Sequence, residues 1–481
     1  MRSVGEIWLD RSASATLQDQ LVAAIRDLIQ RAALVPAEEL PSSRELAAEL
    51  KVSRNTVVYA YDRLISEGYL ESAPRSGVFV NSALALPPQP KGHPRSKGPY
   101  GRIVEATAEI ALGTPRPFRP SQPDVTLFPL LTWNRIRGRV LRREGHGILH
   151  YQAQCVAGYP ALRQGVAAYI REHRGVRCDW NHVVITAGSQ QALFLLAMLL
   201  LRPGDRAYVE DPGYLESRLA WRRAGATVVS GSVDDQGLCL PTQWRGGMTL
   251  VYTTPSRQFP TGAVLSLTRR LALLELATGA NAWIVEDDYD SELRYGAAPL
   301  PSLQSLDRNG RVIYVGTFSK LLFPSLRLGY VVLPDPLLDR FIELKHLTDD
   351  HLPLIDQATL ASFLETGAFY SHIRRCRRAY AQRQAAFLRL FGSGELPLRF
   401  PYTDGGMNLA GFLPPGTDDR VWSQRLSEGG FDVPPLSRYA ERPTRPGLVF
   451  GFTAFTPDVI GASFARVARI LRGVPTKASR A

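Results

Sequence analysis

A chain of 481 residues is too long for one ordinary hydrophobic core, so we expect two or three folding units, one of them as large as an enzyme. Its composition, 45% hydrophobic and 21% charged, is typical of a globular protein, and its longest apolar run, residues 192–201, is about half of a membrane span. No apolar segment near the start predicts a signal peptide, so we expect a cytoplasmic protein without a membrane anchor, while the net charge of +12 favours an anionic partner such as nucleic acid.

Residues 1–80 are predicted to form three helices followed by a β-hairpin. Each helix begins after a serine or threonine that can cap it, and the spacing of Ser42 and Glu45 is that of a capping box. The capping residues are Thr16, Ser42 and Ser53, and the two strands of the hairpin cover 69–71 and 77–80. This order of elements predicts a winged helix-turn-helix domain.

Residues 81–122 are rich in Pro, Gly, Lys, Arg and Ser, a composition that predicts a semi-extended linker. In residues 123–481, strand-like apolar runs alternate with helical stretches, which predicts an α/β domain with a mostly parallel sheet. The runs are 183–186, 206–209, 250–252, 282–285 and 312–315.

The first turn of the third predicted helix carries Arg54, Asn55 and Thr56, where side chains and free N–H groups can reach bases and phosphates. Gly77, at the predicted hairpin tip, allows the backbone to approach a groove closely. Acidic residues slightly outnumber basic ones in residues 1–80. Binding to DNA would therefore depend on a few well-placed cations.

The segments LPSSRELA (40–47), VSRNTV (52–57), EGYL (67–70) and SGVFV (76–80) resemble the winged helix of the GntR family. The resemblance implies binding to a double-stranded DNA operator. It implies that Arg44 and Arg54 contact bases or phosphates, with Asn55, Thr56 and Gly77 in support. The alternative is that Arg44 is an ordinary surface residue and that Thr56 belongs to a helix cap.

Lys320 follows a predicted strand and lies among apolar residues in the segment GTFSKLLFP. Loss of solvation lowers the pKa of such an ammonium group, and the neutral amine can condense with an aldehyde. Taken alone, the pattern also fits a surface lysine after a serine turn.

Asp287 and Tyr289 follow the predicted strand 282–285, at the carboxyl end where ligands of open α/β sheets bind. Alternate residues of an extended segment share a face, so we expect these side chains to lie together. A carboxylate can keep a pyridine nitrogen protonated, and a phenol can hold a ring hydroxyl. The alternatives are a solvated acidic loop or a metal site. No histidine cluster lies nearby and the four cysteines are scattered, so we expect no metal.

Gly188 and Ser189 connect a predicted strand to an apolar helix, an arrangement that offers N–H donors to a phosphate. Many helices are capped in this way, so the pattern alone is weak. Arg327, seven residues after Lys320, can bind the same phosphate or be a structural arginine.

Together these features resemble a fold-type I aminotransferase over about residues 127–455, and the fusion with a GntR-like domain resembles the MocR/GabR subfamily. The resemblance implies pyridoxal 5'-phosphate (PLP) as cofactor, with Lys320 as the Schiff-base lysine, and a homodimer. It assigns to the cofactor site Gly188, Ser189, Gln190, Tyr214, Asp287, Tyr289, Thr317, Lys320 and Arg327. It assigns Arg438 to the carboxylate of an effector.

The sequence departs from the subfamily pattern at three places. Residues after Tyr151 lack the usual Tyr-Gly-Asp-Pro type of stretch, and Arg257 stands where a histidine is common, which would affect effector choice. Near Tyr214, Glu216 and Arg218 leave a second carboxylate-binding arginine unassigned.

We expect a PLP-dependent transcription regulator whose aminotransferase-like domain senses a small amino compound or the cofactor itself. The main alternative is a PLP-dependent aminotransferase with an accessory DNA-binding domain, and sustained turnover with a keto acid would distinguish the two. A third alternative is a winged-helix repressor whose second domain binds no cofactor. The presence of Lys320, Asp287 and Tyr289 argues against it.

Overall fold

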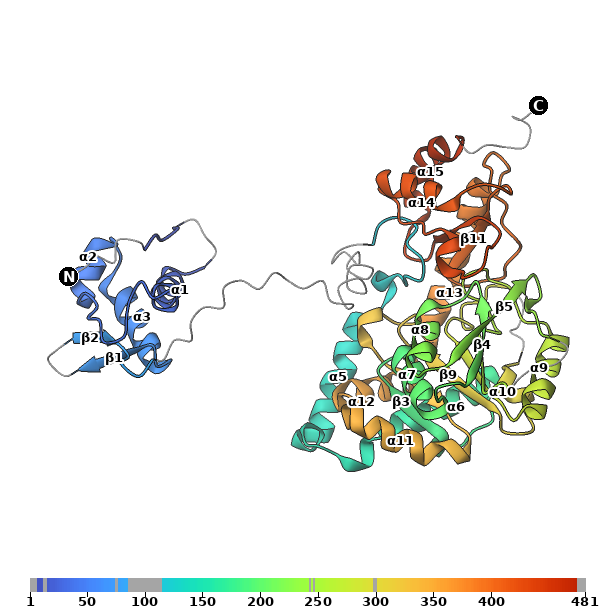
Figure 1. Ribbon diagram of the computed structural model, residues 1–481, viewed down its shortest axis with the longest axis horizontal. Helices are drawn as coiled ribbons and strands as arrows, with labels where there is room; N and C mark the ends of the chain where they lie inside the picture. Colours follow the sequence, from blue (N-terminus) through green and yellow to red (C-terminus); the bar gives the residue numbers. More distant parts are fainter. Residues whose placement is uncertain are drawn as a thin grey trace. The chain divides into compact units, whose positions relative to one another are not determined.

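The computed structural model describes residues 7–11, 15–73, 77–84, 115–241, 244, 247–296 and 301–473. The chain divides into two compact units, unit 1 (residues 1–111) and unit 2 (residues 112–481), each with its own hydrophobic core (Figure 1). Both ends of the predicted linker, 81–122, pack against a unit. The N–H of Asn81 donates to the carbonyl of Tyr69 at 3.0 Å, and Phe118 is fully buried in the core of unit 2. Residues 85–114 of that prediction lie outside the described residues.

Unit 1 has the predicted three helices and hairpin. Each of the three predicted caps accepts a backbone N–H from the residue three positions later, and Ser42 and Glu45 form the capping box. The two strands pair antiparallel, with Leu70 opposite Val80. The elements are α1 (Leu17–Gln30), α2 (Ser43–Glu49), α3 (Arg54–Ser66), β1 (Leu70–Ala73) and β2 (Gly77–Val80). The prediction of a winged helix-turn-helix is confirmed.

Unit 2 is built on an eight-stranded sheet in the order β3-β10-β9-β8-β7-β4-β5-β6. Strands β9, β8, β7, β4 and β5 run parallel, whereas β10 is antiparallel to both of its neighbours and β6 to β5. The strands are β3 (Val183–Thr186), β4 (Arg206–Asp211), β5 (Thr227–Asp234), β6 (Gly237–Leu238), β7 (Leu250–Thr253), β8 (Trp283–Asp288), β9 (Val312–Thr317) and β10 (Gly329–Val332). All five predicted runs are strands, so the predicted mostly parallel sheet is confirmed.

Helices cover both faces of this sheet, which explains why β3, β7 and β9 are buried along their whole length. One face packs against α7, α8 and α11, and the other against α6, α9, α10, α12 and α13. The helices of unit 2 are α5 (Leu130–Glu144), α6 (Pro160–Arg174), α7 (Ser189–Leu200), α8 (Leu215–Arg223), α9 (Leu267–Gly279), α10 (Leu303–Leu306), α11 (Asp335–Asp349), α12 (Leu354–Glu365), α13 (Ala368–Phe391), α14 (Asp419–Glu428) and α15 (Pro457–Leu471).

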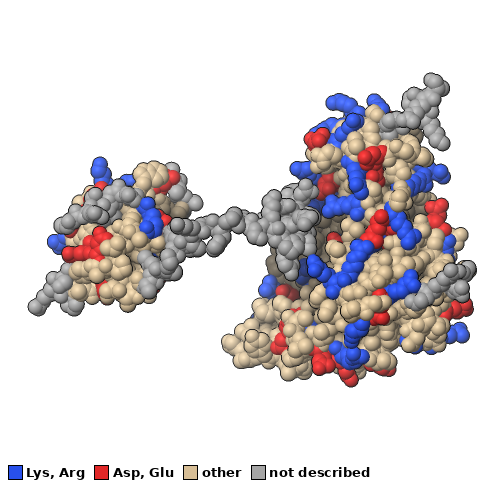
Figure 2. Space-filling view, viewed as in Figure 1, with Lys and Arg blue, Asp and Glu red and all other residues tan. Residues whose placement is uncertain are grey.

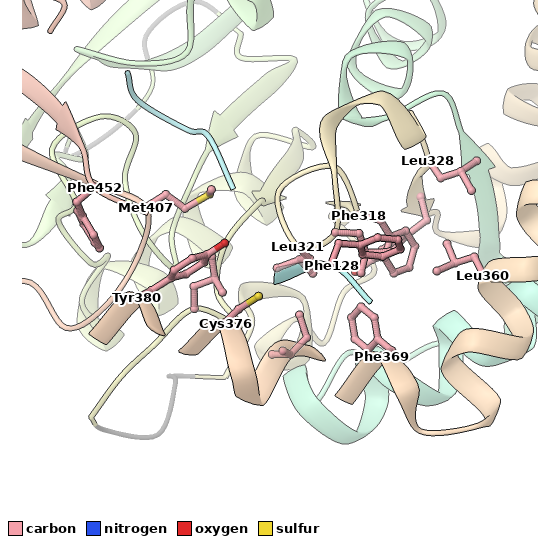
Figure 3. Close-up of a cluster of buried hydrophobic side chains, with 14 of the residues drawn as sticks. Phe128, Phe318, Leu321, Leu328, Leu360, Phe369, Cys376, Tyr380, Met407 and Phe452 are labelled. Atoms are coloured by element: carbon pink, nitrogen blue, oxygen red, sulfur yellow. The ribbon is translucent and has the colours of Figure 1, made fainter. Parts of the chain in front are cut away.

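The C-terminal part of unit 2 is a smaller layer formed by α14, α15 and a two-stranded antiparallel sheet, β11 (Asn408–Phe412) and β12 (Gly447–Gly451). Helix α13 joins this layer to the large sheet through a continuous core (Figure 3). In that core, Phe387 and Phe391 stack at 4.3 Å and both contact Phe118. Phe118 also contacts Phe450 of β12 at 5.9 Å, so the segment that precedes α5 is held by both α13 and the C-terminal layer.

Candidate functional site

Lys320 lies three residues beyond the end of β9, in a loop that the core holds on both sides. Phe318 and Leu321 point into the hydrophobic cluster (Figure 3), which leaves the lysine partly buried. Its Nζ donates to the carbonyl oxygen of Ser121 at 3.2 Å. Burial lowers the pKa of Lys320, and the nearby carboxylate of Asp290 acts in the opposite direction. A lysine in this setting loses its proton more easily than an exposed one.

Asp287 lies near the end of β8 and is buried. Its Oδ2 accepts a hydrogen bond from the hydroxyl of Tyr252 at 2.7 Å, whereas its buried Oδ1 has no hydrogen-bond partner among the described residues. Burial raises the pKa of Asp287 to about 7, although the Tyr252 hydroxyl favours the ionised form. An unpaired buried carboxylate oxygen is costly, so a cationic N–H donor at this point would be strongly favoured.

The predicted phosphate-binding residues lie where β3 and β9 end on either side of β10, a region called the cradle below. Gly329, the first residue of β10, pairs with Thr186 on one side and Thr317 on the other. Gly188, which precedes α7, has a φ of +78°, and a Cβ atom there would lie 3.3 Å from Nη2 of Arg327. Arg327 also donates to the carbonyl oxygen of Ala187 at 3.0 Å. The start of α7, which carries Ser189, and the guanidinium of Arg327 therefore lie close together.

Ser319 belongs to the same cradle, although the sequence motifs did not single it out. Its backbone N–H donates to the hydroxyl of Thr317 at 3.2 Å, and its own Oγ is buried without a partner among the described residues. The loop is fixed by the N–H of Phe318, which donates to the carbonyl oxygen of Leu328 at 3.0 Å. Two buried oxygens, Ser319 Oγ and Asp287 Oδ1, are thus left for a ligand to satisfy.

Aromatic rings line the site next to this cradle. The hydroxyl of Tyr214 donates to Oε1 of Gln190 at 3.2 Å. The ring of Phe259 contacts those of Tyr214, Tyr289 and Tyr439, with centroids 6.2, 6.1 and 5.1 Å away. Phe259 therefore brings together two predicted residues and the neighbour of Arg438.

Arg438 is exposed on a short 3-10 helix, Leu436–Tyr439. This turn lies beside Tyr214 because the N–H of Gly213 donates to the carbonyl oxygen of Tyr439 at 2.9 Å. Within the described ranges, Arg438 forms no ion pair. Its guanidinium is therefore available to an anionic ligand.

Arg257 and Tyr151, the two departures from the subfamily pattern, have different surroundings. Arg257 is buried, lies 3.4 Å from Asp290 and donates to the carbonyl oxygen of Asn408 at 2.6 Å. Its side chain is thus held by the protein itself. Tyr151 is 89% exposed and contacts only the ring of His351 among the aromatic side chains that the structure describes.

In unit 1, Arg44, Arg54 and Asn55 are exposed, and Nε of Arg54 donates to the hydroxyl of Ser43 at 3.3 Å. Thr56 is buried, and its hydroxyl lies 2.8 Å from that of the capping residue Ser53. This contact favours the helix-cap alternative for the Thr56 side chain.

Gly77 begins β2 with a φ of +116°, and a Cβ atom there would lie 2.9 Å from Oε1 of Glu39. The hairpin tip itself, residues 74–76, lies outside the described residues.

On unit 2, Lys and Arg side chains gather over much of the face in Figure 2. The positive charge of the chain is therefore not concentrated on the winged helix.

Two family profiles match the chain, one in each unit: "Bacterial regulatory proteins, gntR family" over residues 17–80 and "Aminotransferase class I and II" over residues 137–435. The probable rhizopine catabolism regulatory protein MocR of Rhizobium meliloti is 36% identical over 94% of this chain and 93% of its own. This chain belongs to the MocR/GabR subfamily of GntR-type transcriptional regulators. The regulator TauR of Rhodobacter capsulatus is 34% identical over 98% of this chain and 99% of its own.

Solved structures similar to this regulator include aminotransferases. LysN, the α-aminoadipate aminotransferase of Thermus thermophilus, is 30% identical with a TM-score of 0.70, over 78% of this chain and 96% of its own. Unit 2 therefore has the fold-type I aminotransferase fold. The relatives that match nearly the whole chain are named as regulators, which favours the regulator over the enzyme alternative. Among the described residues, no helix has the length and apolar character needed to cross a membrane.

Proposed function

We propose that unit 2 of this regulator binds PLP at Lys320 and senses a small amino compound there, and that the event changes operator binding by unit 1. The observation that carries the proposal is the buried Oδ1 of Asp287, which accepts no hydrogen bond from the described residues. Lys320, whose pKa is lowered, belongs to the same proposed site. When bound, PLP supplies an aldehyde with which amines can condense. Its ring is an electron sink when the ring nitrogen is protonated. The residues present fit this group at its nitrogen, its phosphate and its aldehyde.

Different side chains of unit 2 would bind different parts of the cofactor. Asp287, oriented by the Tyr252 hydroxyl, would keep a proton on the pyridine nitrogen. The N–H groups at the start of α7 would bind the phosphate, helped by Arg327 and by the unpaired hydroxyl of Ser319. Tyr289 would hold the ring hydroxyl. Together these contacts would hold the cofactor with its aldehyde available to Lys320.

The partners of the regulator follow from its two units. Unit 1 is a DNA-binding domain, and we propose that it reads an operator as part of a homodimer in the cytoplasm. Large apolar side chains on unit 2 support self-association, because Leu131, Tyr151 and Leu347 are each more than three quarters exposed. Sedimentation equilibrium measures this assembly. Regulation then requires that the amino compound interact differently with two arrangements of the dimer.

The test is the visible spectrum of the purified full-length protein with PLP. We expect an absorption band of the bound cofactor, and we expect Lys320→Ala to lose it and to release the cofactor on dialysis. Lys345→Met is a matched control, because Lys345 is also buried but pairs with Asp349 at 2.7 Å on α11. An unchanged band in Lys320→Ala would refute the lysine assignment.

A further inference from the structure

Glu216 is an acidic residue close in sequence to the aromatic side chains of the proposed site. It lies in the first turn of α8, two residues after Tyr214, and its side chain is exposed. Among the described residues, its carboxylate forms no hydrogen bond or ion pair.

None of the three arginines that follow Glu216 on α8, which are Arg218, Arg222 and Arg223, forms an ion pair with it among the described residues. Arg218 is buried and lies 2.9 Å from Asp211, with Glu441 3.9 Å away. Arg222 lies 2.5 Å from the same Glu441. These two cations therefore pair with other acids, and the charge of Glu216 remains available.

Glu216 and Arg438 both affect the pKa of Tyr439, one of the aromatic side chains of the proposed site. Burial raises the pKa of Tyr439, while Arg438 lowers it and Glu216 raises it, so both charges are within electrostatic range of this phenol. The segments that carry them are joined by the hydrogen bond from Gly213 to Tyr439. Glu216 also acts on Lys320, where it favours the charged amine against the larger effect of burial, which lowers the pKa.

We propose that Glu216 binds a second cationic group of the effector, which makes the effector class a diamino acid. This inference rests on the proposed function, since one amine must react at the Lys320 site. The carboxylate of the ligand would then lie at Arg438 and the second ammonium at Glu216. The rings of Tyr214, Phe259 and Tyr439 would flank the aliphatic chain between them, and aromatic faces also favour a nearby cation.

The same charge disfavours acidic ligands. A ligand with a second carboxylate would bring two like charges together at Glu216, which is unfavourable. Effector choice would therefore depend on the sign of the charge at the far end of the ligand.

Three amino acids with five carbons test this inference on the full-length protein loaded with PLP. L-ornithine has a second ammonium group, L-norvaline has no second charge, and L-glutamate has a second carboxylate. We expect ornithine to have an apparent Kd about tenfold below that of norvaline, as one charge pair of about 1.4 kcal/mol would give, and glutamate to bind weakest. The change in the visible band on titration gives each Kd.

Substitution of Glu216 then isolates its role. Glu216→Gln should remove the tenfold preference for ornithine over norvaline, and Glu216→Lys should reverse the order of ornithine and glutamate. The ornithine concentration at which the change in operator binding is half-maximal should rise by the same factor in Glu216→Gln. Glu275→Gln is a matched control, because it removes an equally exposed carboxylate from α9, which packs in a different core cluster.

The outcomes separate this inference from the proposed function. A visible band together with an ornithine-to-norvaline ratio that is equal in wild type and Glu216→Gln would overturn the inference alone. Absence of any cofactor band in the wild-type protein would refute the proposed function, and the inference with it. Loss of the preference in Glu275→Gln as well would also overturn the role of Glu216.

Discussion

Replacement of Asp287 by asparagine should change stability and cofactor binding in opposite directions. Burial raises the pKa of Asp287 to about 7 from an ordinary value of 3.8. Because the folded-state value lies above the unfolded one, ionisation works against folding. The cost is absent below about pH 4, grows as the pH rises, and reaches about 4 kcal/mol above pH 7.

The asparagine variant avoids that cost. Its carbonyl oxygen can still accept the hydrogen bond from Tyr252, but its amide group takes the position of the unpaired Oδ1 and lacks a partner, which costs about 1–3 kcal/mol. The net result should be a cofactor-free protein that is about 1–3 kcal/mol more stable than wild type at pH 8. At pH 4 the advantage should disappear.

Binding of PLP should weaken in the same variant, because a neutral amide cannot pair with a protonated pyridine nitrogen. Loss of one partner of a buried charge pair costs about 2–5 kcal/mol, which corresponds to a Kd roughly 30-fold to 4,000-fold higher. Titration with PLP, followed by visible absorption, measures the change.

Thermal unfolding of the cofactor-free proteins at several pH values measures the stability effect. Asp288→Asn is the control on the same strand. Asp288 lies 2.8 Å from Arg174 in a buried ion pair, so its replacement should destabilise the protein by about 3–5 kcal/mol. The reasoning is wrong if Asp287→Asn destabilises the cofactor-free protein at pH 8, or if its affinity for PLP equals that of wild type.

Two further predictions concern the two arginines that face ligands. If Arg54 contacts a base, Arg54→Ala should cost roughly 1–3 kcal/mol of operator binding and relax discrimination at one position. A phosphate contact alone would weaken all sequences alike and lower the salt slope by about 1, and unchanged binding in a mobility-shift titration would exclude both. Arg438→Ala should raise the apparent Kd for ornithine about tenfold but leave that for 1,4-diaminobutane, which lacks the carboxylate, unchanged. Equal effects on the two compounds would rule out carboxylate recognition.

The sequence was sufficient to predict those secondary-structure elements that depend only on residues close together in the chain. The starts of α1, α2 and α3 followed from Thr16, Ser42 and Ser53, because a cap needs only the next three residues. The buried strands were visible as apolar runs for a similar reason.

Contacts across the sheet could not be predicted in this way. Tyr252 reaches Asp287 because β7 and β8 are parallel neighbours, a fact that depends on the order of the strands. Phe259 likewise contacts rings from three separate segments. The periodicity of a single sequence does not indicate such contacts between distant segments. The motif that contains Ser319 was recognised, but its unpaired hydroxyl became apparent only with its surroundings.

The hydrogen bond between Lys320 and Ser121 gives the site a mechanical connection to the rest of the chain. Ser121 has a left-handed φ of 59° and belongs to the segment through which the chain from unit 1 enters unit 2. It is held there by Asn408, whose Oδ1 accepts its N–H at 2.6 Å, and by Nζ of Lys320. A reaction at Nζ would take away the second of these anchors. One such hydrogen bond, worth about 0.5–1.5 kcal/mol, changes a two-state equilibrium by about 2-fold to 12-fold, so a reaction at Nζ would loosen the segment around Ser121 by that factor.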